Sequence, residues 1–148
     1  PTRRSSDLDG SGYGINLQGI NALSQRIAEQ GAARHTRAVL FVSSCSVYGS
    51  GPQLRVRESA PLRPDTPLAR SRAACETRLH TMADHGACRV EVFRPRFVLG
   101  LGDQHVLPGL ARLTERGLTL GNGEQRFSII DVDDLARILT DAEIEAML

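Results

Sequence analysis

The sequence predicts an α/β fold built on parallel strands. The stretch RAVLFVSS, residues 37–44, is almost continuously apolar, which is typical of a strand buried on both faces of a parallel sheet. A second strand is expected at CRVEVFRP, residues 88–95, and the connection between the two is long enough to contain a helix. Because parallel strands need long crossover connections, and such crossovers are right-handed, we expect helices to cover the sheet.

Two helices are expected before and between these strands. From about residue 14 to residue 30, apolar side chains recur mostly at helical spacing, and a glycine follows. A second helix is expected from about Pro67 to His85, with Asp65 or Thr66 capping its start. The stretch 49–67 is dense in glycine and proline and is expected to be a loop.

The last third of the chain is expected to hold shorter elements. Residues 98–105 are predicted to form a loop, and a helix is expected to begin near Pro108 and to run to about Arg116. The stretch LTLGNGEQRFSIIDV, residues 118–132, predicts two short strands around a tight glycine turn. A final helix follows, with Asp133 or Asp134 as its cap.

Composition limits the classes of function. All 18 basic residues are arginines, but the net charge is only +1 and the arginines form no basic stripe, so we expect no nucleic-acid partner. No apolar run approaches the roughly 18 residues of a membrane span, and no signal peptide is visible. The three cysteines, Cys45, Cys75 and Cys88, are odd in number and far apart, which indicates free thiols and a cytoplasmic location. The histidines form no metal-binding pattern, so no metal is expected.

Polar residues follow both predicted strands. Because ligands bind at the carboxyl ends of parallel strands, Ser43–Ser46 and Arg94–Phe97 are expected on the ligand-facing rim. This hydroxyl-rich strand end belongs to a wider pattern of five segments that occur in a fixed order. They are NLQGINAL (16–23), VLFVSSCSVYG (39–49), VRESAPLRPDTPLARSRAACE (56–76), VFRPRFVLGLGD (92–103) and GNGEQRFSIIDVDDLARIL (121–139).

Together these segments resemble the extended short-chain dehydrogenase/reductases, the NAD-dependent epimerase/dehydratase family, including relatives of 3β-hydroxysteroid dehydrogenase. The resemblance implies part of a Rossmann-like, doubly wound parallel sheet that lacks the N-terminal strands and the glycine-rich loop. The phosphate-binding pattern G-x-x-G-x-x-G does not occur, and DGSGYG (9–14) follows no apolar strand. We therefore expect NAD or NADP in the intact parent protein, and none bound by this chain alone.

The resemblance also assigns the positions of catalysis. Enzymes of this family move a hydride between a substrate carbinol carbon and nicotinamide, with a tyrosine and a lysine in the pattern Y-x-x-x-K. Ser44, four residues before Tyr48, takes the position of the hydroxyl that hydrogen-bonds the substrate oxygen. The tyrosine and lysine positions fall on Leu68 and Arg72. Leucine has no proton to give, and a guanidinium does not reproduce the contacts of an ammonium, so the site is expected to be catalytically incomplete.

Four further residues are assigned by the resemblance. Pro95 and Arg96 would lie beside the nicotinamide and contact its carboxamide through their backbone, or form an ordinary connection between strand and loop. Phe97 stands where nucleotide-sugar enzymes often carry asparagine, which favours a more apolar substrate. Arg126 matches an arginine that reaches a substrate phosphate, or is a solvated residue of a strand.

The first residues have a separate explanation. PTRRSSDL, residues 1–8, is the translation of a common short-read sequencing adapter, CCTACACGACGCTCTTCCGATCT, and a natural disordered arm is the alternative. On this interpretation residues 9–148 are the middle-to-C-terminal part of an NAD(P)-binding domain that runs into the substrate region, and the coding sequence continues upstream.

Three functional hypotheses remain open. The intact parent is an NAD(P)-dependent enzyme acting on a small molecule with a carbinol or carbonyl, or it is a non-catalytic NAD(P)-binding sensor or interaction protein. Alternatively, this piece has no function of its own. The helices near 15–30 and 67–85 resemble those that build the family's dimers, so the parent is expected to be a homodimer.

Overall fold

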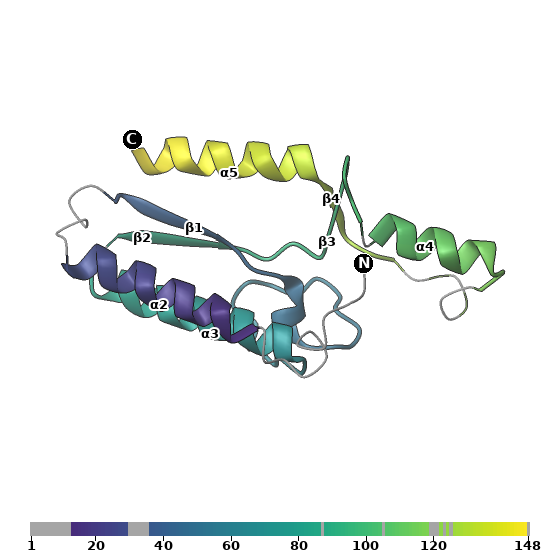
Figure 1. Cartoon of the computed structure of the whole chain (residues 1–148), viewed down its shortest axis with the longest axis horizontal. Coiled ribbons are helices and arrows are strands. Elements are labelled where there is room, and N and C mark those ends of the chain that lie inside the picture. Colours follow the sequence, from purple (N-terminus) through teal and green to yellow (C-terminus); the bar gives the residue numbers. More distant parts are fainter. Residues whose placement is uncertain are drawn as a thin grey trace.

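The computed structural model describes residues 13–29, 36–86, 88–104, 106–118, 122, 124 and 126–147 (Figure 1). The adapter-like residues 1–8 and most of DGSGYG lie outside this part of the chain. In chain order the elements are α2 (Gly14–Glu29), β1 (Ala38–Val42), the 3₁₀ turn η3 (Cys45–Tyr48), α3 (Pro67–Asp84), β2 (Arg89–Phe93), β3 (Phe97–Leu99), α4 (Val106–Glu115), β4 (Ile129–Asp131) and α5 (Val132–Met147).

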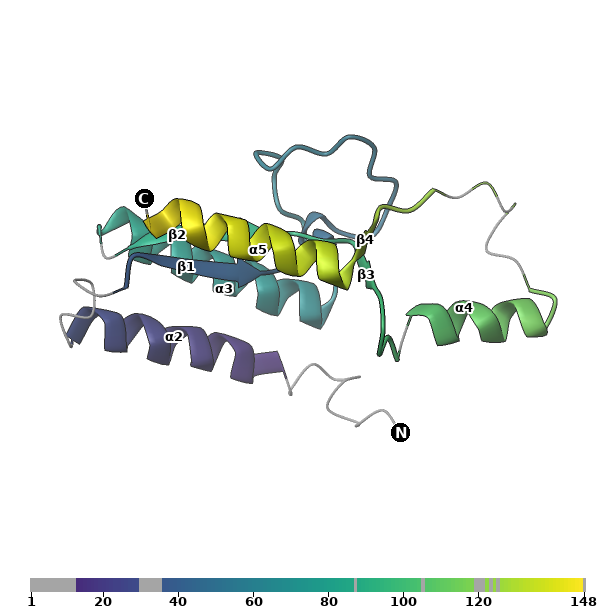
Figure 2. The ribbon, with the colours of Figure 1, turned by 90° about the horizontal axis from the view of Figure 1, so that it is seen from above.

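The architecture is three layers, helix on sheet on helix. β1 and β2 pair in parallel, with Ala38 opposite Arg89 and Val42 opposite Phe93. Helices α2 and α3 lie side by side on one face of this sheet, and α5 lies on the other (Figures 1 and 2). This confirms the α/β class and the parallel pairing that the sequence predicts.

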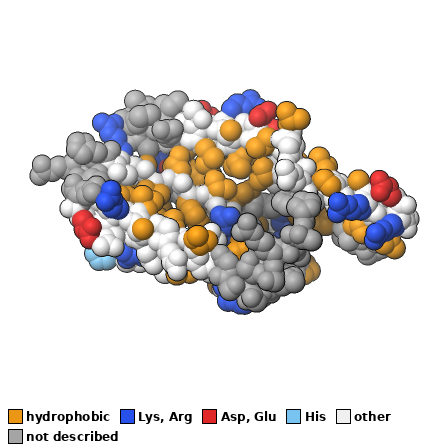
Figure 3. All heavy atoms as spheres, in the orientation of Figure 1, with side chains coloured by type: hydrophobic (Ala, Val, Ile, Leu, Met, Phe, Trp, Pro, Cys, Tyr) orange, Lys and Arg blue, Asp and Glu red, His pale blue; other side chains and the backbone are white. Residues whose placement is uncertain are grey.

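The core lies between the sheet and the α2–α3 layer. Ile27, Leu79 and Met82 are buried there, and the partly buried Val39 and Phe41 pack against them from the sheet. Figure 3 shows apolar side chains gathered over the middle of the molecule, while α4 at one end carries charged side chains. In the described part of the chain, no helix combines the length and the apolar character that crossing a membrane requires.

Helix α3 agrees with its prediction at both ends. Thr66 is its N-terminal cap, and the Thr66 hydroxyl accepts a hydrogen bond from the backbone N–H of Ala69 at 3.1 Å. The helix ends at Asp84, and Gly86 follows with φ of +71°. The cap matters for function because it fixes where Leu68 and Arg72 project.

One expectation for the last third of the chain is wrong. Residues 98 and 99, part of the predicted loop, belong to β3 (Phe97–Leu99), which pairs in parallel with β4 (Ile129–Asp131). The expected hairpin partner of β4, at residues 118–120, lies mostly outside the described residues. A strand of three residues carries too little pattern to be recognised, and its pairing comes from a distant segment.

The start of α5 also differs from the prediction. The helix begins at Val132, so Asp133 and Asp134 lie in its first turn rather than at its cap. Asp131 takes the capping role, because its Oδ1 accepts a hydrogen bond from the backbone N–H of Asp133 at 2.8 Å. The two later carboxylates still suit the first turn, where negative charge is favourable.

Candidate functional site

The carboxyl ends of β1 and β2 meet at one edge of the sheet. The backbone N–H of Ser43 donates to the carbonyl of Phe93 at 2.7 Å, and that of Cys45 donates to the carbonyl of Pro95 at 3.0 Å. The parallel pairing thus continues past both strands. It places the serine-rich segment beside the segment that begins at Arg94, on the rim that the sequence predicts.

Ser44 lies on this rim with its hydroxyl only partly engaged. It is the cap of η3, in an extended conformation, and its Oγ accepts a hydrogen bond from the backbone N–H of Ser46 at 3.2 Å. The hydroxyl hydrogen and a second lone pair are left for a ligand. Ser44 lines a cavity of about 390 Å³, and Leu68, Arg96 and Phe97 line the same cavity.

Leu68 and Arg72 are separated by this geometry. Leu68, in the first turn of α3, shares the cavity with Ser44. Arg72, one turn later, does not line it. Its Nη1 donates to the carbonyl of Val42 at 2.6 Å, and its guanidinium lies 5.8 Å from the centre of the Phe41 ring. The charge at the lysine position is therefore held against the end of β1.

Pro95, Arg96 and Phe97 have separate surroundings. The carbonyl of Pro95 is occupied by the N–H of Cys45. Arg96 is exposed, and its Nη1 donates to Oε1 of Gln53 at 3.0 Å. Phe97 is the first residue of β3, and its ring meets that of Phe127 edge to face at 5.4 Å, which gives the cavity an apolar wall.

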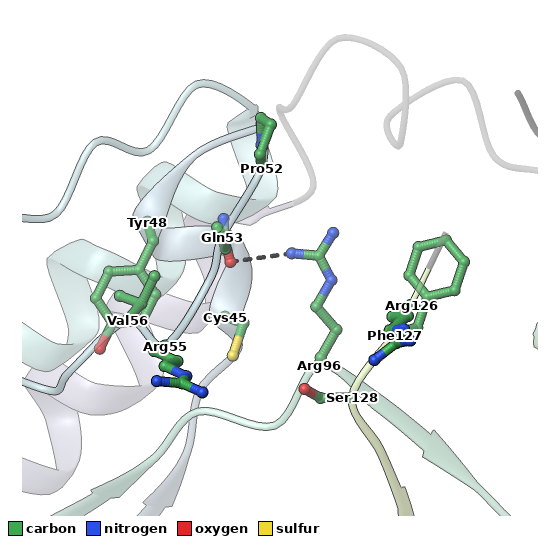
Figure 4. Close-up of a pocket in the computed structure, with 11 residues that line it drawn as sticks. Cys45, Tyr48, Pro52, Gln53, Arg55, Val56, Arg96, Arg126, Phe127 and Ser128 are labelled. Atoms are coloured by element: carbon green, nitrogen blue, oxygen red, sulfur yellow. Dashed lines mark hydrogen bonds between the residues drawn. The ribbon is translucent and has the colours of Figure 1, made fainter. Parts of the chain in front are cut away.

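Arg126 lies in a neighbouring cavity of about 500 Å³ (Figure 4). Arg96 and Arg55 line this cavity too, together with Tyr48, Gln53 and Phe127. Arg96 and Arg126 therefore line the same cavity. The resemblance had placed Arg96 beside the cofactor and Arg126 near a substrate phosphate. Arg55 was not anticipated, and nothing in its sequence context distinguishes it from the other arginines of the chain.

A buried ion pair between Arg94 and Glu76 lies next to the rim and connects it to α3. Arg94 Nη2 contacts Glu76 Oε2 at 2.7 Å, and its Nη1 donates to the hydroxyl of Tyr48 at 2.5 Å and to the carbonyl of Glu58 at 3.0 Å. Glu76 is 1% exposed. The hydrogen bond to Glu76 raises the pKa of Arg94. The hydroxyl of Tyr48 is thus held by Arg94.

The free thiol on the rim is not an activated nucleophile. Cys45 Sγ donates to the carbonyl of Arg94 at 2.7 Å. Burial raises the pKa of Cys45, and the positive charges of Arg96 and Arg94 oppose this only in part. Thiolate, not thiol, is the reactive form, so the raised pKa favours the less reactive protonated form of Cys45. Among the described residues, no three of the histidines, cysteines and carboxylates gather as a metal site would need.

Comparisons with known proteins show which family the chain resembles. The chain matches the profile of the NAD dependent epimerase/dehydratase family over residues 3–142. It is 30% identical over 139 residues to the uncharacterized protein y4nG of Sinorhizobium fredii strain NGR234, an alignment that covers 92% of this chain and 33% of that protein.

Two solved structures are similar over almost the whole chain. A candidate epimerase from Burkholderia cenocepacia J2315 superposes with a TM-score of 0.76 at 25% identity, covering 99% of this chain and 48% of that one. The NAD dependent NDP-hexosamine 5,6-dehydratase TunA, involved in tunicamycin biosynthesis, superposes with a TM-score of 0.74 at 26% identity, covering 95% of this chain and 47% of that one. The chain thus spans a third to a half of the length of these relatives, and it belongs to the NAD dependent epimerase/dehydratase family.

Proposed function

We propose that the protein containing this chain keeps the family's site for a substrate oxygen at Ser44 but has lost the pair that transfers the proton, so that it does not turn over a carbinol substrate. The observation that carries this proposal is the cavity shared by Ser44 and Leu68. The side chain beside the serine is a hydrocarbon, which neither takes nor returns a proton.

The position of Arg72 supports the same conclusion. In the family, a lysine ammonium lowers the pKa of the tyrosine and contacts the nicotinamide ribose. The guanidinium of Arg72 donates to the carbonyl of Val42 and packs over Phe41. An arginine held in this way supplies neither function at the Ser44 cavity.

NAD or NADP would supply the acceptor or donor of hydride, but the described residues do not fit a complete site for it. The carbonyl of Pro95 accepts a hydrogen bond from the backbone N–H of Cys45. The guanidinium of Arg72 donates a hydrogen bond to the carbonyl of Val42. No glycine-rich phosphate loop occurs in the sequence. Any bound dinucleotide would need other parts of the parent protein, and we derive no step through it.

The substrate class remains a small molecule with a carbinol or carbonyl. The relative TunA is an NDP-hexosamine dehydratase, which makes sugar nucleotides one candidate class. The ring of Phe97, which lines the Ser44 cavity, favours an apolar portion in the ligand.

The test restores the missing pair in the protein encoded by the longest reading frame that contains this chain. Leu68→Tyr combined with Arg72→Lys is expected to create NAD(P)-linked turnover of carbinol compounds where the unmodified protein shows none. The matched control is Leu68→Phe with Arg72→Lys, which adds the ring without the hydroxyl and is expected to stay inactive. Turnover by the unmodified protein would refute the proposal.

A second candidate function is an NAD(P)-binding sensor, favoured by the same loss of the tyrosine and lysine. Fluorescence titration with NADH distinguishes the two. Binding without turnover supports the sensor, and an absence of binding excludes it.

Two finer assignments accompany this proposal. Helices α2 and α3 pack together, with Asn16 Nδ2 donating to Ser71 Oγ at 3.2 Å, and Ile15 of α2 is 69% exposed. A homodimer of the parent through these helices would cover such side chains. The free cysteines of the described chain agree with a cytoplasmic location.

A further inference from the structure

The loop between η3 and α3 carries an exposed segment beside the two cavities of the rim. From Gly51 to Ser59 every residue is exposed except Gln53, which is half-buried. Figure 2 shows this loop projecting away from the sheet and its helices. We call residues 51–57 the strap, because several of them form one wall of the cavity of about 500 Å³. Gly51, at the start of the strap, also lines the Ser44 cavity.

The chain is fixed on both sides of the strap. Before it, the backbone N–H of Ser50 donates to Oδ2 of Asp65 at 2.8 Å, which ties the start of the loop to its end. After it, the carbonyl of Glu58 accepts a hydrogen bond from Nη1 of Arg94 at 3.0 Å. Arg94 is itself held by the buried Glu76. The strap is therefore a segment hinged between two fixed ends.

One side chain holds the strap between these ends. Gln53 Oε1 accepts a hydrogen bond from Nη1 of Arg96 at 3.0 Å, and Gln53 Nε2 donates to the carbonyl of Gly49 at 2.5 Å (Figure 4). Residues 51–56 make no other hydrogen bond and no ion pair within the part of the chain that the structure describes. A segment with so few bonds and so little buried surface belongs to the parts of a fold that open locally at small cost.

The strap also leaves apolar side chains in water. Leu54 is 87% exposed, and Val56 is exposed as well. Phe127 lies on the opposite side of the cavity, beyond Arg96, and its ring is exposed too (Figure 4). Burial of apolar surface favours an arrangement in which these side chains meet. Arg55, between the two apolar residues of the strap, has φ of +50°, which is unfavourable for a residue other than glycine and is relieved when the backbone changes.

We propose that the strap is a movable cover, held in its present position by the hydrogen bond between Gln53 and Arg96. When this bond is released, Leu54 and Val56 close onto Phe127. The hydrogen bond favours the present position only modestly, because water replaces it when it breaks. Apolar burial favours the closed position. Since neither contribution is large, the strap exchanges between the two positions.

Closure of the strap also affects the Ser44 cavity. The two cavities share Cys45, Gly51 and Arg96 as lining residues, so a strap closed over the larger cavity keeps water from the smaller one on that side. Only this consequence for a ligand at Ser44 rests on the proposed function. The movement of the strap stands without it.

Disulfide cross-linking of the full chain tests the movement. Arg55→Cys with Ser128→Cys places one thiol on the strap and one across the cavity, and it leaves the apolar side chains in place. The background is Cys45→Ser with Cys88→Ser, which removes the two native thiols that are not buried. Two cysteines are bridged only when their Cα atoms come within about 7 Å, so the rate of disulfide formation reports how often the strap closes. Adding Arg96→Met is expected to raise this rate by about fivefold to tenfold, because it removes the bond that holds the strap.

Arg126→Met is the matched control, because Arg126 lines the same cavity and makes no hydrogen bond to the strap. Its cross-linking rate is expected to stay within twofold of that of the cysteine pair alone. Gln53→Met removes the other partner of the bond and is expected to raise the rate as Arg96→Met does. Both changes together are expected to raise it by less than the product of their separate effects, as for two partners of one bond.

Three outcomes overturn the proposal. They are a failure of every variant to form the disulfide, an equal acceleration by Arg126→Met, and effects of Gln53→Met and Arg96→Met that simply multiply. Cross-linking needs neither cofactor nor turnover. The discovery of enzyme activity would therefore refute the proposed function and leave this result standing.

Discussion

Replacing Arg94 by methionine tests whether the ion pair beneath the rim holds the fold together. The change keeps much of the apolar length of the side chain and removes the guanidinium. It leaves the Glu76 carboxylate, which is 1% exposed, without its positive partner. It also removes the hydrogen bonds to the Tyr48 hydroxyl and to the carbonyl of Glu58.

The size of the effect follows from burial. The side chain of Arg94 is 15% exposed, so solvent screens this pair little. Breaking a buried pair by removing one partner costs about 3–5 kcal/mol of unfolding free energy, because an uncompensated charge stays inside. Domains are stable by about 5–15 kcal/mol, so Arg94→Met is expected to remove a large part of the stability.

Urea unfolding followed by circular dichroism measures this loss. The matched control is Arg89→Met at the start of β2, the strand that ends just before Arg94, because Arg89 pairs with Glu91 and is 48% exposed, and a surface pair is worth about 0–1 kcal/mol. The double variant Arg94→Met with Glu76→Leu is expected to be more stable than Arg94→Met alone, since it no longer buries a lone carboxylate. If Arg94→Met costs no more than Arg89→Met, the reasoning is wrong.

Two further predictions concern the rim. Gly49→Ala is expected to cost about 2–4 kcal/mol of unfolding free energy, because Gly49 has φ of +93° and an added Cβ would lie 2.7 Å from the carbonyl oxygen of Arg63. Gly51→Ala, where an added Cβ meets nothing within 4 Å, is the control in the same urea assay, and equal losses would contradict this account. Since burial raises the pKa of Cys45, the folded state favours the protonated thiol. The associated stability is complete below the unfolded thiol's pKa of about 8.5 and is lost as pH rises through the folded pKa. Alkylation by iodoacetamide, followed for each cysteine by mass spectrometry, should accelerate at a higher pH for Cys45 than in the urea-unfolded chain. Arg96→Gln should shift this profile higher still, because the charge of Arg96 lowers the Cys45 pKa, and an unchanged profile would exclude that influence.

The main elements were predictable because their signals are local. The apolar run of β1, the helical spacing of α2 and the cap at Thr66 all depend on neighbours in the sequence, and the structure has each of them. The pairing of β3 with β4 was not predictable from such signals. Both strands have three residues, and each is defined only by a partner that lies far away in the chain.

At the rim, too, some features were predictable from the sequence and others were not. The resemblance located Ser44 and Leu68, and the structure brings them to one cavity because the end of β1 and the start of α3 are both fixed by backbone pairing and capping. The direction of the Arg72 side chain was not predictable. It depends on a free carbonyl at Val42 and on the nearby Phe41 ring, which are contacts in space.

Arginine supplies every basic side chain of the sequence, so residue type alone does not distinguish a structural charge from a ligand-binding one. The partners do distinguish them. The guanidinium of Arg94 is enclosed by Glu76, Tyr48 and the carbonyl of Glu58, and its charge is neutralised inside the protein. Arg55, Arg96 and Arg126 line the larger cavity, where no carboxylate of the described residues joins them. Burial against Glu76 therefore identifies Arg94 as a structural charge, which its residue type alone does not.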